Sequence, residues 1–147
     1  MKDKLKSTTG ERSGQSLVEL AISLMVILML LLGAVEFSLA LFQYVTIRDA
    51  AQEGAVYGSF TPGDLAGVRY RVAAAASDVM VIDPNEPMVS AVINGRPCEK
   101  SGETNTITVT VKYPHVIAFP LVGPMIGTNT INLTASVTNT ILSPSCE

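Results

Sequence analysis

The segment Ser13-Gly14-Gln15-Ser16-Leu17-Val18-Glu19-Leu20 stands directly before a long apolar run and decides how the chain is organised. Glu19 is the last charged residue before sixteen apolar or small residues, Leu20 to Val35. A helix rises 1.5 Å per residue, so this run is about 24 Å long. A bilayer core is about 30 Å thick, and apolar residues on both sides of the run close the gap. The pattern predicts a helix that spans a membrane.

Charge is distributed unevenly around this run. The chain of 147 residues has a net charge of −3, which gives no reason to expect nucleic-acid binding. The first fourteen residues are nevertheless net positive, because Lys2, Lys4, Lys6 and Arg12 outnumber Asp3 and Glu11. By the positive-inside rule the N-terminus lies in the cytoplasm and the C-terminal part outside the membrane.

Glu19 needs a compensating charge, because a carboxylate at the edge of a membrane helix is costly. A cut after Gly14 would create an α-amine on Gln15, four residues from Glu19 on the same helical face. A basic leader, Gly14 and a Glu five residues later are similar to a type IV prepilin cleavage site, G|xxxxE. One alternative is an ordinary signal anchor. Another is a secretory signal peptide cut after Ala40, although the apolar region is longer than such peptides have and Glu36 precedes that cut.

Beyond Glu36 the helix pattern becomes one-sided. Apolar or small residues recur at helical spacing among polar ones, at Leu41, Val45, Ala51 and Ala55. We expect a leader at residues 1–14, a membrane and stalk helix at 15–58, and an extracytoplasmic head at 59–147. Gly33 and Glu36 are the candidate residues for contact between helices; the alternative for Gly33 is that it has no role.

The head begins with a second predicted helix, from Pro62 to Met80. Thr61 is the expected N-cap, Pro62 the first helical residue, and Asp64 is favourable to the helix dipole. Its expected buried face consists of Leu65, Val68, Val72, Ala76 and Val79. A turn-rich linker follows at residues 83–87.

The remainder of the head is predicted to be β-structure. A short strand at Val89–Ile93 is followed by Asn94-Gly95, a type I′ turn pair. Thr106–Tyr113 and Thr130–Thr138 alternate apolar residues with threonine, which indicates antiparallel strands with one face on water. The inward residues are expected to be Ile107, Val109, Val111 and Tyr113, and Ile131, Leu133, Ala135 and Val137. The predicted fold is an α+β head on a helical stalk.

The segment 114–127 is too apolar for a solvated loop and is rich in Pro and Gly. We expect neither a helix nor a central strand there. It is either a surface that contacts a partner or a loop tucked over the small core.

The two cysteines, Cys98 and Cys146, both lie in the exported part. A disulfide between them is favoured by an oxidising compartment, and two free thiols are the alternative. Their spacing is not that of a metal site, so we expect neither a metal nor a cofactor.

An enzyme is not expected, and no catalytic residue is assigned. His115 is the single histidine and lies next to an apolar run, which gives poor material for a His-centred triad. The chain has no phosphate-binding Gly-rich loop, HExxH or CxxC motif. Asp78, Asp83 and Glu86 are read as solvated surface residues.

Three stretches together resemble one known family: residues 14–21, the pair Glu36-Phe37, and residues 50–55, Ala-Ala-Gln-Glu-Gly-Ala. They resemble the TadE-like family of small pseudopilins of tight-adherence (Flp) pilus systems. The resemblance implies cleavage between Gly14 and Gln15 by a prepilin peptidase, and a role in pilus assembly. The implied partners are that peptidase, other pilins and pseudopilins, the assembly platform and membrane lipid.

Two departures from the major Flp pilin favour a minor pseudopilin. Leu20 stands where Flp pilins usually have Tyr, and the C-terminal domain is much larger. The alternative function is a single-pass, membrane-anchored binding module outside the cytoplasm that never joins a filament.

Overall fold

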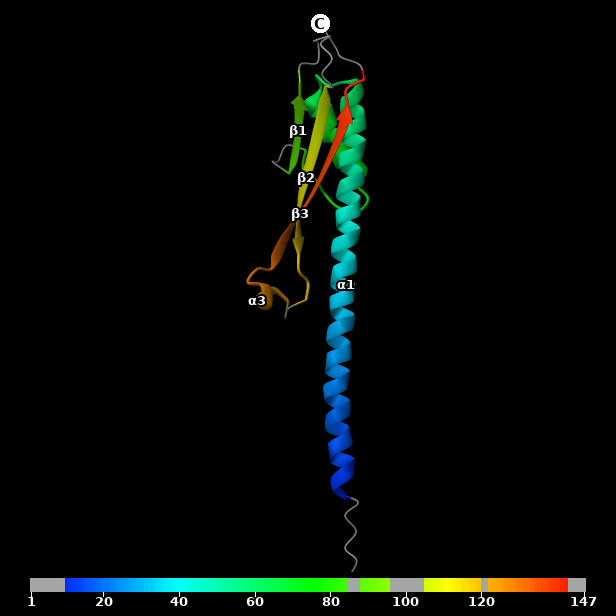
Figure 1. The fold of residues 1–147 in the computed structure, drawn as a ribbon, viewed down its shortest axis with the longest axis vertical. Coiled ribbons are helices and arrows are strands. Elements are labelled where there is room, and N and C mark those ends of the chain that lie inside the picture. The colour runs from blue at the N-terminus through cyan, green and yellow to red at the C-terminus, as the bar shows by residue number, and fades with distance from the viewer. Residues whose placement is uncertain (1–9, 85–87, 96–104, 120–121, 143–147) are drawn as a thin grey trace, which may run out of the picture. The chain divides into compact units, whose positions relative to one another are not determined.

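The computed structural model describes residues 10–84, 88–95, 105–119 and 122–142. The chain divides into two compact units, Met1–Phe37 and Ser38–Glu147. One helix, α1 (Gly10–Phe60), forms the described part of the first unit and continues into the second (Figure 1). At 51 residues it is longer than the sequence pattern predicted. The predicted class, a long apolar helix followed by a small α+β head, is confirmed.

The head contains a three-stranded antiparallel sheet in the order β1-β2-β3. The strands are β1 (Val89–Asn94), β2 (Thr106–Val116) and β3 (Thr130–Thr140). Val111 of β2 lies opposite Val89 on one side and Ala135 on the other, so the inward residues of all three strands fall in one row. This follows from the alternation of side chains along each strand.

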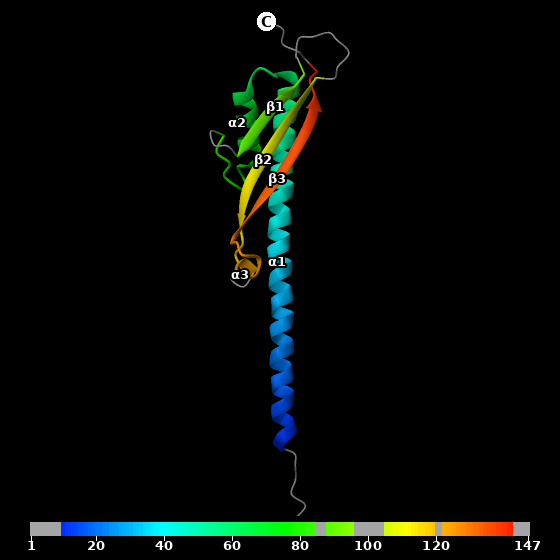
Figure 2. The ribbon, with the colours of Figure 1, turned by 60° about the vertical axis from the view of Figure 1, so that its left-hand side comes forward.

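One face of the sheet is covered by helices (Figure 2). The last turns of α1 and the second helix, α2 (Leu65–Ala76), bury small and branched side chains against the inward residues of the sheet. The central members of this core are fully buried: Ile47, Ala51, Ala55, Val68, Val72, Ile107, Val109 and Val111. Close approach depends on Gly54 of α1, because a Cβ there would come within 2.5 Å of the Val72 side chain.

The predicted inward face of the strands is largely confirmed. Ile107, Val109 and Val111 are fully buried, and Ala135 is 2% exposed. Tyr113, Leu133 and Val137 are half-buried at the margin of the core, whereas Ile131 is exposed near the start of β3. Burial is therefore greatest where both helices cover the sheet.

The predicted start of α2 is wrong by three residues. Asp64, not Thr61, is the N-cap, and its carboxylate accepts a hydrogen bond of 2.8 Å from the backbone N–H of Gly67. Thr61 instead donates its hydroxyl to the Tyr57 carbonyl at the end of α1. The helix also ends at Ala76 rather than Met80, so Val79 is 46% exposed while Val68, Val72 and Ala76 are buried as predicted.

The prediction that residues 114–127 contain no central strand is also wrong, because Pro114, His115 and Val116 belong to β2. The Lys112 N–H donates to Met88 on the β1 side, so the nitrogen of Pro114, two residues on, points to the same side. β1 begins at Val89, opposite Val111, and does not extend alongside Pro114. The N–H that proline lacks is therefore not needed for a hydrogen bond to β1. The prediction that this segment contains no helix is wrong as well, because a short helix, α3 (Val122–Ile126), precedes β3.

The type I′ turn expected at Asn94-Gly95 is not formed. Gly95 has a positive φ of 92°, but Asn94 still belongs to β1 and does not have one. Cys98 and Cys146 lie outside the described residues, so their disulfide stays a prediction.

Candidate cleavage and assembly segment

The predicted cleavage position lies inside regular helix. α1 begins at Gly10, so Gly14 and Gln15 have helical backbone on both sides. A Cβ on Gly14 would meet no atom within 4 Å. Packing within the described part of this chain therefore does not require glycine at this position.

Glu19 lies on the exposed surface of α1, one helical turn after Gln15. Its backbone carbonyl accepts a hydrogen bond of 2.8 Å from the Ser23 hydroxyl. Ser23 is the only strongly polar side chain within the apolar run Leu20 to Val35. Because its hydroxyl is hydrogen-bonded inside the helix, Ser23 is compatible with a lipid environment. The Glu19 carboxylate is the one ionisable group on the helix between Gly14 and Val35.

The large apolar side chains of α1 between Leu17 and Val35 are exposed in the described structure. Leu17, Leu24, Met25 and Leu30 each expose at least half of their surface. Among the described residues, α1 is the one helix long and apolar enough to cross a membrane, and none of its most apolar window is buried. This suggests a single-pass membrane anchor.

Gly33 and Glu36 lie one helical turn apart at the end of this surface. A Cβ on Gly33 would meet nothing within 4 Å, so among the described residues the glycine has no packing contact that requires it. Glu36 is half-buried, unlike the residues immediately before it. The structure does not bring either of them to Gly14 or Glu19, which are earlier turns of the same helix.

Sequence reasoning missed a polar cluster at the junction of α1 and α2. The Tyr57 hydroxyl donates to the second carboxylate oxygen of Asp64 at 2.8 Å, and Arg71 lies over the Tyr57 ring, 5.2 Å from its centre. The pKa of Asp64 is lowered, first by the Gly67 N–H and then by the Tyr57 hydroxyl. The signal in the sequence was that Asp is a stronger N-cap than Thr.

A second missed contact joins the stalk to the sheet. His115 is 4% exposed, and its Nδ1 lies 2.7 Å from Oε1 of Gln43 on α1. The single histidine is thus part of the packing between β2 and α1. No signal in the sequence pairs it with Gln43, which is 72 residues away.

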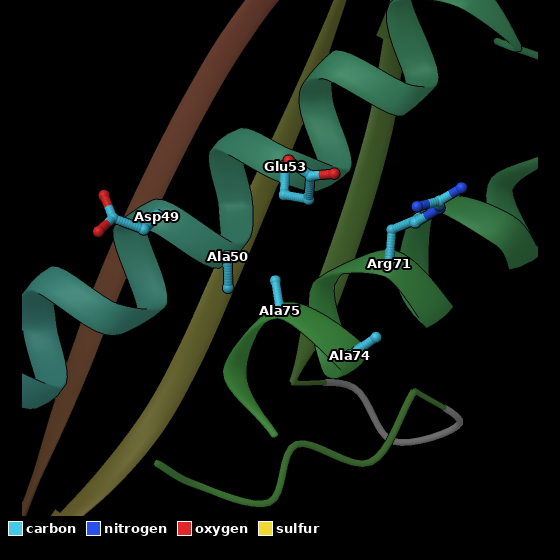
Figure 3. A pocket seen from close by; sticks show the side chains of 6 residues that line it. All are labelled: Asp49, Ala50, Glu53, Arg71, Ala74 and Ala75. Atoms are coloured by element: carbon cyan, nitrogen blue, oxygen red, sulfur yellow. The ribbon is translucent and has the colours of Figure 1, made fainter. Parts of the chain in front are cut away.

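A shallow groove of about 430 Å³ lies between α1 and α2. Figure 3 shows Ala50 and Ala75 facing each other across it, with Glu53 on α1 and Arg71 on α2 at its rim. Its other lining residues are Asp49 and Ala74. Among the described residues no group of three His, Cys, Asp or Glu could hold a metal ion, so this groove has no such ligand set.

The model of the TadE-like protein family matches residues 14–56. No curated protein and no solved structure matches the chain. The matched range begins at the predicted cleavage position and ends four residues before α1 does. A TadE-like domain suggests a protein associated with the Tad pilus. The resemblance found in the sequence is confirmed: residues 14–56 of this chain are a TadE-like segment.

Proposed function

We propose that this chain is a minor pseudopilin of a tight-adherence pilus, cleaved after Gly14 by a prepilin peptidase. The observation that carries the proposal is the position of the TadE-like match, which starts at residue 14 and covers the exposed apolar helix. The basic leader before it supports an orientation with the N-terminus in the cytoplasm and the head outside.

In this proposal the exposed surface of α1 has two successive environments. In the membrane it contacts lipid, and in the assembled state it contacts the helices of other pilins and the assembly platform. Gly33, with open space around it, would let a neighbouring helix approach closely. The head has a non-enzymatic role, and its buried His115 supports packing rather than catalysis.

The charge on Glu19 provides a reason for assembly. A carboxylate near lipid is unfavourable, and an opposite charge lowers that cost when it is close and shielded from water. The α-amine on Gln15 of a neighbouring subunit, shifted along the filament, can supply this charge. Pairing would then favour transfer from lipid into the filament.

The N-terminus of the mature protein tests the cleavage step. Protein purified from membranes should begin at Gln15, and Gly14→Leu should leave a species larger by the 14-residue leader. Gly10→Leu is the matched control, because Gly10 is also in the leader but lacks a Glu five residues later. Normal processing of Gly14→Leu, or a chain that starts at Met1, would favour the membrane-anchored module. A start at Leu41 would indicate a secreted domain.

A second experiment tests assembly. Glu19→Ala should insert into the membrane and be cleaved after Gly14, because the apolar run directs insertion, but it should not co-purify with pili or support their formation. Glu53→Ala removes an exposed glutamate further along α1 and should assemble normally. Normal pili that contain the Glu19→Ala protein would show that charge pairing is not the mechanism.

A further inference from the structure

The outer edge of β3 is an open edge of the sheet. In an antiparallel pair the backbone groups of successive residues point alternately toward and away from the neighbouring strand. The bonds from Ile117 to Asn129 and from Ile141 to Asn105 show that odd-numbered residues of β2 and β3 bond to each other. The even-numbered residues of β3, from Asn132 to Thr140, therefore turn their N–H and C=O groups away from β2.

Among the described residues, partners are found at the two ends of this edge. The Thr130 N–H donates to the Thr128 hydroxyl, and the Leu142 N–H donates to the Ser59 carbonyl at the end of α1. Between them, no described residue bonds to the outward backbone groups of β3.

The sequence of this edge does nothing to prevent pairing. Natural sheets protect open edges with charged residues, proline, bulges or very short strands. Residues 130–142 contain no charged residue, proline or glycine, and β3 is 11 residues long. The opposite edge strand, β1, has six residues. Leu133 and Val137, on the inward face of β3, are half-buried and could be covered further by an added strand.

The sequence of β3 is also nearly self-complementary. Residues 131–141 read Ile-Asn-Leu-Thr-Ala-Ser-Val-Thr-Asn-Thr-Ile, with Ser136 at the centre. If two copies pair antiparallel about Ser136, Thr134 lies opposite Thr138, Ala135 opposite Val137 and Ile131 opposite Ile141. Apolar residues then face apolar ones, and polar residues face polar ones, apart from the pairing of Leu133 with Asn139.

We propose that β3 is a homodimerisation edge, at which a second copy of this chain adds its own β3 antiparallel about Ser136. The outward residues Asn132, Thr134, Ser136, Thr138 and Thr140 form the new backbone ladder. Their side chains lie on the outer face, where hydroxyl contacts already fix two of them: Thr138 with Thr108 at 2.9 Å and Ser136 with Thr110 at 3.0 Å. The edge is thus ordered before a partner arrives, which lowers the entropic cost of pairing.

This pairing goes beyond the proposed pilus function and does not depend on it. An uncleaved or Glu19→Ala protein would still carry the β3 edge, so the two proposals fail separately.

Disulfide trapping tests the register. Ser136 and its copy would form a hydrogen-bonded pair, whose Cα atoms lie about 5.5 Å apart in an antiparallel ladder, within the range of about 4.4–6.8 Å that a disulfide spans. In full-length protein carrying Cys98→Ser and Cys146→Ser, Ser136→Cys should form a dimer under mild oxidation in detergent micelles. Ser90→Cys is the matched control, because Ser90 and Ser136 both lie opposite Thr110, on opposite edges of the sheet. Equal cross-linking of both variants, or none at Ser136, would overturn the proposal.

A charge at the edge provides an independent test. Ser136→Lys should reduce the dimer fraction at least tenfold, as measured by sedimentation in micelles, because it places two cations at the two-fold axis. Ser136→Ala, which loses the hydroxyl contact alone, and Ser90→Lys should both remain dimeric. Dimers of Ser136→Lys at wild-type levels, or a cross-link in cells from Ser136→Cys to a different protein, would show that the edge does not pair with itself.

Discussion

Two stretches of α1 have contrasting surroundings. Between Leu20 and Val35 the helix carries no charged residue and is apolar on all sides, and its large side chains are exposed. Between Ile47 and Gly58 the buried residues recur on one side, at Ile47, Ala50, Ala51, Gly54, Ala55 and Gly58, and they contact α2 and the sheet. A helix that is apolar on all sides needs an apolar environment outside its own chain, whereas a one-sided helix finds its partner within the chain. Mutations in the two stretches should therefore affect different properties.

The largest effect on folding is expected in the head core. Ile107 is fully buried, so Ile107→Ala should lower the free energy of unfolding of the head by about 2–5 kcal/mol, through lost burial and the remaining cavity. Leu24→Ala, in the exposed stretch of α1, should leave the unfolding midpoint of the head unchanged. Chemical unfolding of the micelle-bound protein, followed by a head-specific probe, measures both. Equal destabilisation by the two variants would mean that the stretches do not behave separately.

The two glycines of α1 give a sharper comparison, because the same substitution meets different surroundings. Gly54→Leu places a side chain against Val72 and should cost about 1–3 kcal/mol of head stability by overpacking, partly offset by better helix propensity. Gly33→Leu has open space and should not alter the head. A defect of Gly33→Leu in pilus formation, with normal unfolding of the head, would support a contact between helices of different subunits.

The sequence predicted those parts of the fold that depend on periodicity. The alternation in β2 identified Ile107, Val109 and Val111, and the helical spacing in α2 identified Val68, Val72 and Ala76. Both patterns are set by local geometry, with periods of 2.0 and 3.6 residues, and survive in the folded molecule.

The errors lie where tertiary contacts decide between local alternatives. Thr61 and Asp64 are both capping residues; in the fold the Tyr57 hydroxyl bonds the Asp64 carboxylate, whereas the Thr61 hydroxyl donates to the Tyr57 carbonyl at the end of α1. Pro114 is tolerated in β2 because β1 begins opposite Val111 and does not extend alongside Pro114. In the candidate segment, the sequence identified Gly14 and Glu19, but their roles depend on molecules other than this chain, so their assignment stays a prediction.

The smallest expected effect concerns the cap of α2 and acid stability. The pKa of Asp64 is lowered from its ordinary value of 3.8, mainly by the Gly67 N–H and secondarily by the Tyr57 hydroxyl. A carboxyl with a lower pKa in the folded state stabilises the fold above its unfolded pKa, and this contribution is lost as the pH falls through the folded pKa. Stability should therefore decline below about pH 3.8.

Asp64→Asn keeps a good N-cap but removes the titrating group. Wild type should be slightly more stable than this variant at pH 6, and the difference should vanish toward pH 2. Tyr57→Phe removes the smaller of the two causes and should lose only part of the pH dependence. Unfolding curves recorded across this range measure the difference directly. A difference in unfolding free energy between wild type and Asp64→Asn that stays constant down to pH 2 would contradict this prediction. It would mean that the pKa of Asp64 is not lowered in the folded head, and that the residue stabilises α2 through its capping geometry alone.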